Sequence, residues 1–184
     1  MSADTSADAS ADAKCRITLL QYYLTDTEKF ALKNKMKINK NKTQVMIFNK
    51  SRKLDFPPEL EFTDGTKLEV ISQIRLVGLV ISDNLSWHDN TLYICRKART
   101  KLWIIRRMKR LSLSNEQMFD VYCKEIRSIV EYGVPVWHPS LTKKDSIEIE
   151  RIQKVAFRII LEGLYTDYTE ACLYFDTTTL KQRR

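Results

Sequence analysis

The residues best suited to metal or nucleophile chemistry in this sequence are its two histidines and four cysteines. His88 and His138 lie 50 positions apart, and the cysteines are scattered over positions 15, 95, 123 and 172. Zinc sites usually take ligands from closely spaced pairs, and no CxxC pair is present. The only acidic residue adjacent to either histidine is Asp89, so the sequence context indicates no hydrolase triad. We therefore predict no metal site and interpret the cysteines as reduced thiols of an intracellular protein, in the nucleus or cytoplasm.

A proline-rich corner, "GVPVWHPS", joins two helical hydrophobic patterns within residues 126–160. Trp137 and His138 between two prolines could form a ligand site or pack as a hinge. Ligand partners for His138 would have to come from distant elements, which favours packing. We predict that Trp137 wedges between the two helices and sets their crossing, because the flanking prolines fix the backbone and the indole is large and apolar.

Two segments carry much of the positive charge of this 184-residue chain, whose net charge is +8. Neither segment contains an acidic residue. The first comprises Lys33, Lys35, Lys37, Lys40, Lys42, Lys50, Arg52 and Lys53, and the second comprises Arg96, Lys97, Arg99, Lys101, Arg106, Arg107, Lys109 and Arg110. Such concentration favours a polyanion partner, because each cation that displaces a condensed counterion adds salt-dependent affinity. A solvated helix face is the alternative, and composition alone leaves both open.

Several functional classes lack their motifs. The sequence contains no GxxxxGK[ST], GxGxxG or HExxH, and its four glycines leave little room for a phosphate-cradling loop. No apolar run of about 18 residues and no signal-peptide pattern is present. We infer neither a membrane partner nor a small-molecule substrate.

The N-terminal half predicts a mixture of helix and short strands. Residues 1–16 contain an Ser-Ala-Asp repeat, for which we predict disorder because no large side chain can be buried. A helix over 17–36 and a strand over 44–48 follow. "LEFTDGTKLEV" indicates a hairpin around Asp64 and Gly65. "IRLVGLVI" (74–81) predicts one apolar strand interrupted by Gly78.

The C-terminal half predicts helices. We expect a helix over 91–111 that buries Trp103 and an apolar face formed by Leu92, Cys95, Leu102, Ile105 and Met108. Two more helices are expected. The first begins at Ser114, which forms a capping pair with Gln117, and ends at Gly133. The second begins at Thr142, which forms a capping pair with Asp145, and ends at Gly163. The final "TTTLKQRR" is typical of a first helical turn, so we interpret the chain as a fragment. The predicted class is α+β.

Three segments in this order resemble the downstream part of a non-LTR (LINE-type) retrotransposon reverse transcriptase: "NKMKINKNKTQVMIF", "IRLVGLVISDNLSWHDNTLYICRKARTKLWIIRRMKR" and "IRSIVEYGVPVWHPSLTKKDSIEIERIQKVAFRII". The resemblance implies a partial palm of antiparallel strands plus a helix over 17–85. It also implies a helical thumb-like bundle over 86–184. The family activity is RNA-directed DNA polymerisation, which uses Mg²⁺.

The resemblance also implies roles for individual residues. Asn39, Lys42 and Thr43 match the palm motif after the catalytic hairpin, which makes Lys42 a vestigial palm lysine. The tripeptide Leu76, Val77 and Gly78 matches the primer grip, with leucine and valine in place of the usual aromatic residue and leucine. The thumb's basic surface, which binds the backbone of an RNA–DNA or DNA duplex without reading sequence, matches Lys97, Arg99, Lys101, Arg106, Arg107, Lys109 and Arg110.

The catalytic carboxylates of the family lie upstream of the matched segments, so we predict a truncated reverse transcriptase without activity or cofactor of its own. Two alternatives are a nucleic-acid-binding module with its own role and a decayed reading frame with none. The stretch "LVISDNLSWHDNT" is also similar to a short N-terminal region of AlkB-like tRNA-modifying proteins. Their iron site needs two histidines and a carboxylate on a β-barrel, a pattern that this sequence does not predict.

Overall fold

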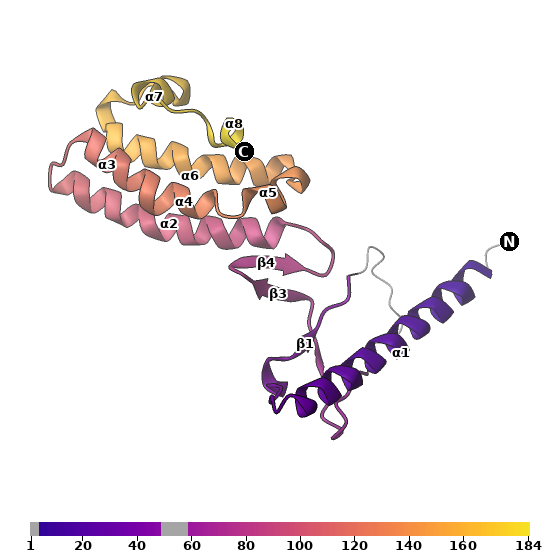
Figure 1. Ribbon diagram of the computed structural model, residues 1–184. Coiled ribbons are helices and arrows are strands. Elements are labelled where there is room, and N and C mark those ends of the chain that lie inside the picture. The colour runs from indigo at the N-terminus through magenta and orange to yellow at the C-terminus, as the bar shows by residue number, and fades with distance from the viewer. Residues whose placement is uncertain (1–3, 49–58) are drawn as a thin grey trace. The chain divides into compact units, whose positions relative to one another are not determined.

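The chain forms two compact units, Met1–Ile74 and Arg75–Arg184. The computed structural model describes residues 4–48 and 59–184, in which helices dominate and two two-stranded sheets occur (Figure 1). The predicted α+β class is therefore confirmed. The division between the units lies earlier than the predicted boundary between residues 85 and 86, because β4 (Leu79–Ser82) packs against α2 (His88–Arg110) and belongs with the helices.

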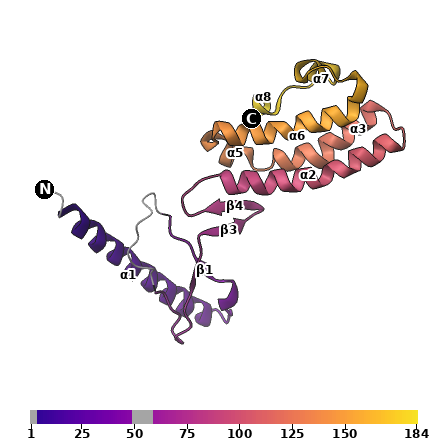
Figure 2. The same cartoon turned by 180° about the vertical axis from the view of Figure 1, so that it is seen from behind.

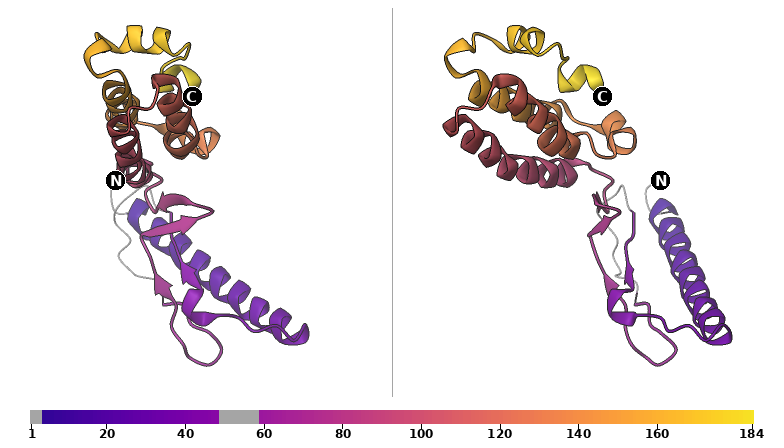
Figure 3. Two further views of the ribbon diagram at one scale, coloured as in Figure 1. Left: turned by 90° about the vertical axis from the view of Figure 1, so that its left-hand side faces the viewer. Right: turned by 60° about the vertical axis from the view of Figure 1, so that its left-hand side comes forward.

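The first unit contains α1 (Asp4–Lys33), which Figure 3 shows as one uninterrupted helix. We predicted disorder for residues 1–16, and the structure corrects this from Asp4 onward. The repeat places an alanine in every few positions, such as Ala7, Ala9 and Ala11. Alanine has the highest helix propensity of all residues, and this local preference opposes the lack of large apolar side chains.

Strand pairing in the first unit is shorter than predicted and differs in direction. After a 3₁₀ turn (Lys40–Lys42), β1 (Gln44–Val45) pairs in parallel with β2 (Glu69–Val70). The prediction of an antiparallel palm remnant is therefore wrong for this pair. A long connection separates the two strands, which is what a parallel arrangement requires.

The turn predicted at Asp64 and Gly65 is present between the opposed residues Glu61 and Lys67, which form an antiparallel bridge. Gly65 has φ +81°, a value that glycine adopts without a steric penalty. The Glu28 carboxylate on α1 accepts hydrogen bonds from the Thr63 amide at 3.0 Å and the Thr63 hydroxyl at 3.1 Å. The turn is thereby attached to α1.

Residues 73–82 form a hairpin and not the single strand that we predicted. β3 (Gln73–Leu76) and β4 are joined by Val77 and Gly78, with φ +48° and +82°. Two consecutive positive φ values define the tight turn whose twist suits a two-residue hairpin. Gly78 therefore reverses the chain, and the predicted primer-grip tripeptide lies at the turn with Leu76 and Val77 exposed.

Three helical segments lie side by side in the second unit (Figures 1 and 2). They are α2, the segment containing α3 (Asn115–Val121), a π-helical stretch (Tyr122–Arg127) and α4 (Ser128–Val130), and α6 (Lys143–Leu161). Two 3₁₀ turns (His138–Ser140 and Glu162–Leu164) flank α6. The shorter α7 (Tyr168–Tyr174) and α8 (Leu180–Arg183) pack against α6. The result is a helical bundle, as predicted for this half.

The N-terminal helix caps predicted at Ser114 and Thr142 are confirmed, whereas α6 ends at Leu161, with Glu162 and not Gly163 at positive φ. The Ser114 hydroxyl accepts a hydrogen bond from the Gln117 amide at 3.3 Å, and the Gln117 side chain accepts one from the Ser114 amide at 3.1 Å. The Thr142 hydroxyl accepts a bond from the Asp145 amide at 3.1 Å. These bonds satisfy amides that the first turn of a helix leaves without partners.

Trp137, at the end of α5 (Val134–Trp137), is fully buried in the bundle core, which confirms its predicted packing role. Its indole Nε1 donates a 2.8 Å hydrogen bond to the Tyr132 carbonyl oxygen. His138 is half-buried, and its Nδ1 has no hydrogen-bond partner among the residues that the structure describes. The corner therefore acts as a packed hinge of the bundle.

Candidate functional site

The second basic segment lies on α2, whose position is fixed at its N-terminal end. The Asp89 carboxylate accepts a 2.7 Å hydrogen bond from the Ser82 hydroxyl, and the buried Asn90 side chain accepts one from the Val80 amide at 3.1 Å. Both bonds attach β4 to the first turn of α2. Ile94, Ala98, Leu102 and Ile105 bury the opposite side of the helix in the core.

The exposed side of α2 carries five arginines around a tryptophan. Arg96, Arg99, Trp103, Arg106 and Arg110 follow one another at spacings of three or four residues, the spacing of one helix face. Arg107 is one turn after Trp103. We call these six residues the arginine face. All six side chains are exposed.

Four of the five arginines have no acidic partner among residues 4–48 and 59–184. Arg99 is the exception, because its guanidinium lies 2.7 Å from the Glu148 carboxylate, which also contacts Arg151. The others, Arg96, Arg106, Arg107 and Arg110, form no ion pair with the described residues. Their guanidinium groups are therefore free to bind an external anion through two parallel N–H donors.

Trp103 is 54% exposed, and the prediction that it packs inside is wrong. The core side of α2 runs through Ile94, Ala98, Leu102 and Ile105, and position 103 lies away from it. The prediction gave the apolar character of tryptophan more weight than its place in the helical period. The prediction that Leu92 belongs to the buried apolar face is also wrong, because its side chain is 49% exposed.

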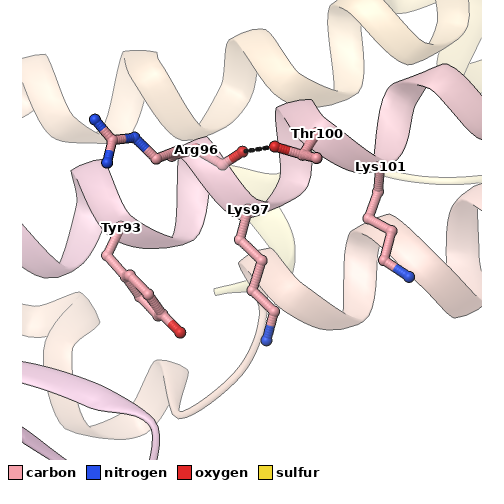
Figure 4. Close-up of a pocket in the computed structure, with 5 residues that line it drawn as sticks. All are labelled: Tyr93, Arg96, Lys97, Thr100 and Lys101. Atoms are coloured by element: carbon pink, nitrogen blue, oxygen red, sulfur yellow. Dashed lines mark hydrogen bonds between the residues drawn. The ribbon is translucent and has the colours of Figure 1, made fainter.

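The lysines of the segment lie on a different side of α2. Figure 4 shows Tyr93, Lys97 and Lys101 projecting together while Arg96 projects away from them. Nine residues separate Lys97 from Arg106, which places them about 180° apart around a helix of 3.6 residues per turn. The predicted set of Lys97, Lys101 and Arg106 or Arg107 therefore divides between two faces, and one backbone strand cannot contact all of it.

Two shallow depressions adjoin the lysine side. One, of about 370 Å³, is lined by Tyr93, Arg96, Lys97, Thr100 and Lys101 (Figure 4). The other, of about 300 Å³, is lined by Arg75, Gly78, Tyr93, Ile94, Lys97, Ser128, Ile129 and Tyr132. The structure thus brings the turn glycine of the predicted primer grip to the same depression as Lys97. The Tyr132 hydroxyl donates a 2.9 Å hydrogen bond to the Val77 carbonyl and holds this turn in place.

Two predicted binding lysines have partners within the fold. The Lys101 ammonium lies 3.0 Å from the Glu125 carboxylate. Lys109 donates a 2.7 Å hydrogen bond to the Ile160 carbonyl near the end of α6 and lies 3.7 Å from the Glu162 carboxylate. Because a cation at the last turn satisfies free carbonyls and the helix dipole, Lys109 serves the bundle itself.

The first basic segment shows a different arrangement. Lys40 pairs with Asp64 and lies 4.9 Å from the centre of the Phe62 ring. The hydrogen bond from Lys40, followed by those from Thr66, lowers the pKa of Asp64 to about 2. Lys42, the predicted vestigial palm lysine, is exposed and is the last residue of the 3₁₀ turn. Three further basic residues of this segment, Lys50, Arg52 and Lys53, lie outside the described residues.

One polar cluster was missed by sequence reasoning. The Nδ1 atom of His88 lies 2.7 Å from Oδ1 of the buried Asp145, whose Oδ2 accepts a 2.6 Å hydrogen bond from the Thr142 hydroxyl. The sequence indicates only Asp89, the neighbour of His88, as a carboxylate near the ring, because no local pattern links residues 57 positions apart. No serine or cysteine of the described chain is hydrogen-bonded to the His88 ring. The cluster therefore joins the first turns of α2 and α6.

No three histidine, cysteine, aspartate or glutamate side chains come close enough to hold a metal within the described parts of the chain. Over the same residues, none of the helices has the length and apolar character needed to cross a membrane. All four cysteines are free thiols.

No family model, curated protein or solved structure matches this chain. The arginine face is then the feature with the most definite chemistry. Within the described residues it combines four arginines that form no ion pair and an exposed indole on one helix.

Proposed function

We propose that this chain binds nucleic-acid backbones through the arginine face of α2. The carrying observation is the set of four exposed arginines, Arg96, Arg106, Arg107 and Arg110, that have no acidic partner in the described structure. The ion pairs that α2 does form, through His88, Arg99, Lys101 and Lys109, are with acidic side chains elsewhere in the same chain. Phosphate oxygens are the anions best matched to guanidinium donors.

The expected binding is independent of sequence. Phosphate contacts position a protein on a strand without reading base identity. From Arg96 to Arg110, α2 rises about 21 Å at ~1.5 Å per residue, so the arginines can contact several successive phosphates. The helix is held at its start by β4 and along its core side by the bundle, so the arginines are carried by an ordered helix.

The resemblance to a retrotransposon reverse transcriptase supports the same class of partner. We propose that the chain corresponds to the palm and thumb end of such an enzyme, binds an RNA–DNA or DNA duplex, and has no polymerase activity by itself. A nucleic-acid-binding module with its own role is the second candidate, which the free arginines support equally. In both cases the proposed location is the nucleus or cytoplasm, where such partners occur.

The proposal is tested by the salt dependence of duplex binding. Arg106→Gln together with Arg107→Gln removes two phosphate contacts, so the log-log salt slope becomes shallower by about two units, at ~0.9 per phosphate. Lys143→Gln with Lys144→Gln is the matched control. That pair is also exposed, adjacent and without an acidic partner among the described residues, but it lies at the start of α6. Equal changes for both pairs would show that only net charge attracts the duplex.

A further inference from the structure

Trp103 stands at the centre of the arginine face. Arg99 precedes it by one helical turn, and Arg106 and Arg107 follow it by one turn. Within the described structure, its indole makes no ring contact with another aromatic residue and no hydrogen bond. An exposed indole of this kind contributes little to the core, so its flat apolar surface is available to a partner.

We propose that this face binds single-stranded nucleic acid, with an unpaired base stacked on the indole of Trp103 and neighbouring phosphates bound by the arginines. This inference rests on the proposed function and names the form of nucleic acid that the face prefers. Bases in a duplex stack on one another and cannot reach a side chain on a flat helix face. An unpaired base can stack on an aromatic ring whatever its identity.

The dimensions of the face fit a short strand. The ~21 Å between Arg96 and Arg110 corresponds to about six phosphates of a stacked strand at ~3.4 Å per phosphate. Trp103 lies near the middle of this length, so cations lie on both sides of a base that contacts it. This alternation of cations with an aromatic platform is typical of sites for single strands.

A membrane surface is the competing partner for a helix with arginine and tryptophan. Helices that lie in a membrane interface insert a continuous apolar face. The apolar face of α2 is instead buried against the bundle. The other exposed apolar residues of this side, Leu92 and Leu111, lie about 16 Å and about 12 Å along the helix from Trp103, too far to form one strip with it.

The test is a double-mutant cycle on the full chain, with a thymidine oligonucleotide and an abasic strand of the same length as probes. Trp103→Leu is expected to weaken binding of the thymidine strand roughly 5- to 150-fold, the effect of losing one stacked base. It leaves binding of the abasic strand and the salt slope unchanged, because no cation is removed. Trp103→Phe keeps an aromatic ring and is expected to retain most of the affinity.

Each contrary outcome is distinct. Unchanged affinity of Trp103→Leu for the thymidine strand, or equal losses on both strands, would overturn the stacking inference alone if the arginine pair still controls the salt slope. Wild-type chain that binds a duplex but neither single strand would overturn this inference and leave the proposed function standing, whereas wild-type chain that binds neither a duplex nor a single strand would overturn both. Phosphatidylserine vesicles are the remaining probe. Loss of vesicle binding by Trp103→Leu, with oligonucleotide binding intact, would assign the indole to a membrane surface and overturn the inference.

Discussion

The Nδ1 atom of His88 lies 2.7 Å from Oδ1 of Asp145, which joins the first turns of α2 and α6. The Asp145 side chain is 3% exposed and also accepts the Thr142 hydroxyl hydrogen bond. These two helices form the largest interface of the bundle. The pair therefore fixes the position of the helix that carries the arginine face.

Loss of the Asp145 carboxylate is expected to destabilise the helical unit. Asp145→Ala leaves the Thr142 hydroxyl and the His88 ring without the carboxylate acceptor that the buried Asp145 provides, at a cost of about 2 kcal/mol in the free energy of unfolding. Asp145→Asn keeps an acceptor and is expected to cost less. Urea unfolding followed by circular dichroism measures both values. Identical stability of wild type and Asp145→Ala would show that the cluster is not a structural joint.

The hairpin turn at Val77 offers a stabilising substitution. Val77 has φ +48°, which is unfavourable for a β-branched residue, and Gly78 follows with φ +82°. Asparagine followed by glycine is the preferred pair for such a turn. Val77→Asn is therefore expected to raise the free energy of unfolding by about 1 kcal/mol, the lower end of the cost of holding a non-glycine residue in this conformation.

Gly78→Ala provides the opposite control for this turn. An added Cβ would lie 3.3 Å from the Tyr132 ring, and the positive φ disfavours any side chain. Thermal unfolding of the two variants should therefore move in opposite directions. A destabilised Val77→Asn would indicate that the valine side chain makes a contact worth more than the strain.

Asp64 is expected to titrate with a midpoint near 2, because hydrogen bonds from Lys40 and Thr66 lower its pKa from 3.8. The contact therefore stabilises the turn fully above about pH 4, and this contribution is lost as the pH falls toward 2. An NMR titration of the Asp64 carboxyl carbon measures the midpoint directly. Lys40→Met should move the midpoint upward toward 3.8. A wild-type midpoint already at 3.8 would refute the contact.

Features set by neighbouring residues could be predicted from the sequence. The caps at Ser114 and Thr142 depend on a bond that spans three positions, and Gly133, the predicted end of the second helix, lies three residues after α4 with φ +66°. The burial of Trp137 followed from its place between two amphipathic helices. In each case a local pattern is sufficient because the interaction itself is local.

Features set by distant residues could not be predicted in this way. Asp145 reaches His88 only after the bundle has packed, so no spacing in the sequence indicates the pair. Trp103 was misplaced because hydrophobicity was judged by residue type, although its position in the helical period places it outside. The division of Lys97 and Arg106 between two faces follows from the same period, which a count of basic residues ignores.

The central claim is that nucleic acid binds to the arginine face and does not bind to the depression lined by Arg75 and Lys97. The most direct test compares the duplex-binding salt slopes of two variants that each lack two cations, Arg106→Gln/Arg107→Gln and Arg75→Gln/Lys97→Gln. Arg75 and Lys97 line the same depression. We expect a slope shallower by about two units for the first variant and no change for the second. A shallower slope for the second variant, with the first unchanged, would contradict the claim and assign the binding to the depression.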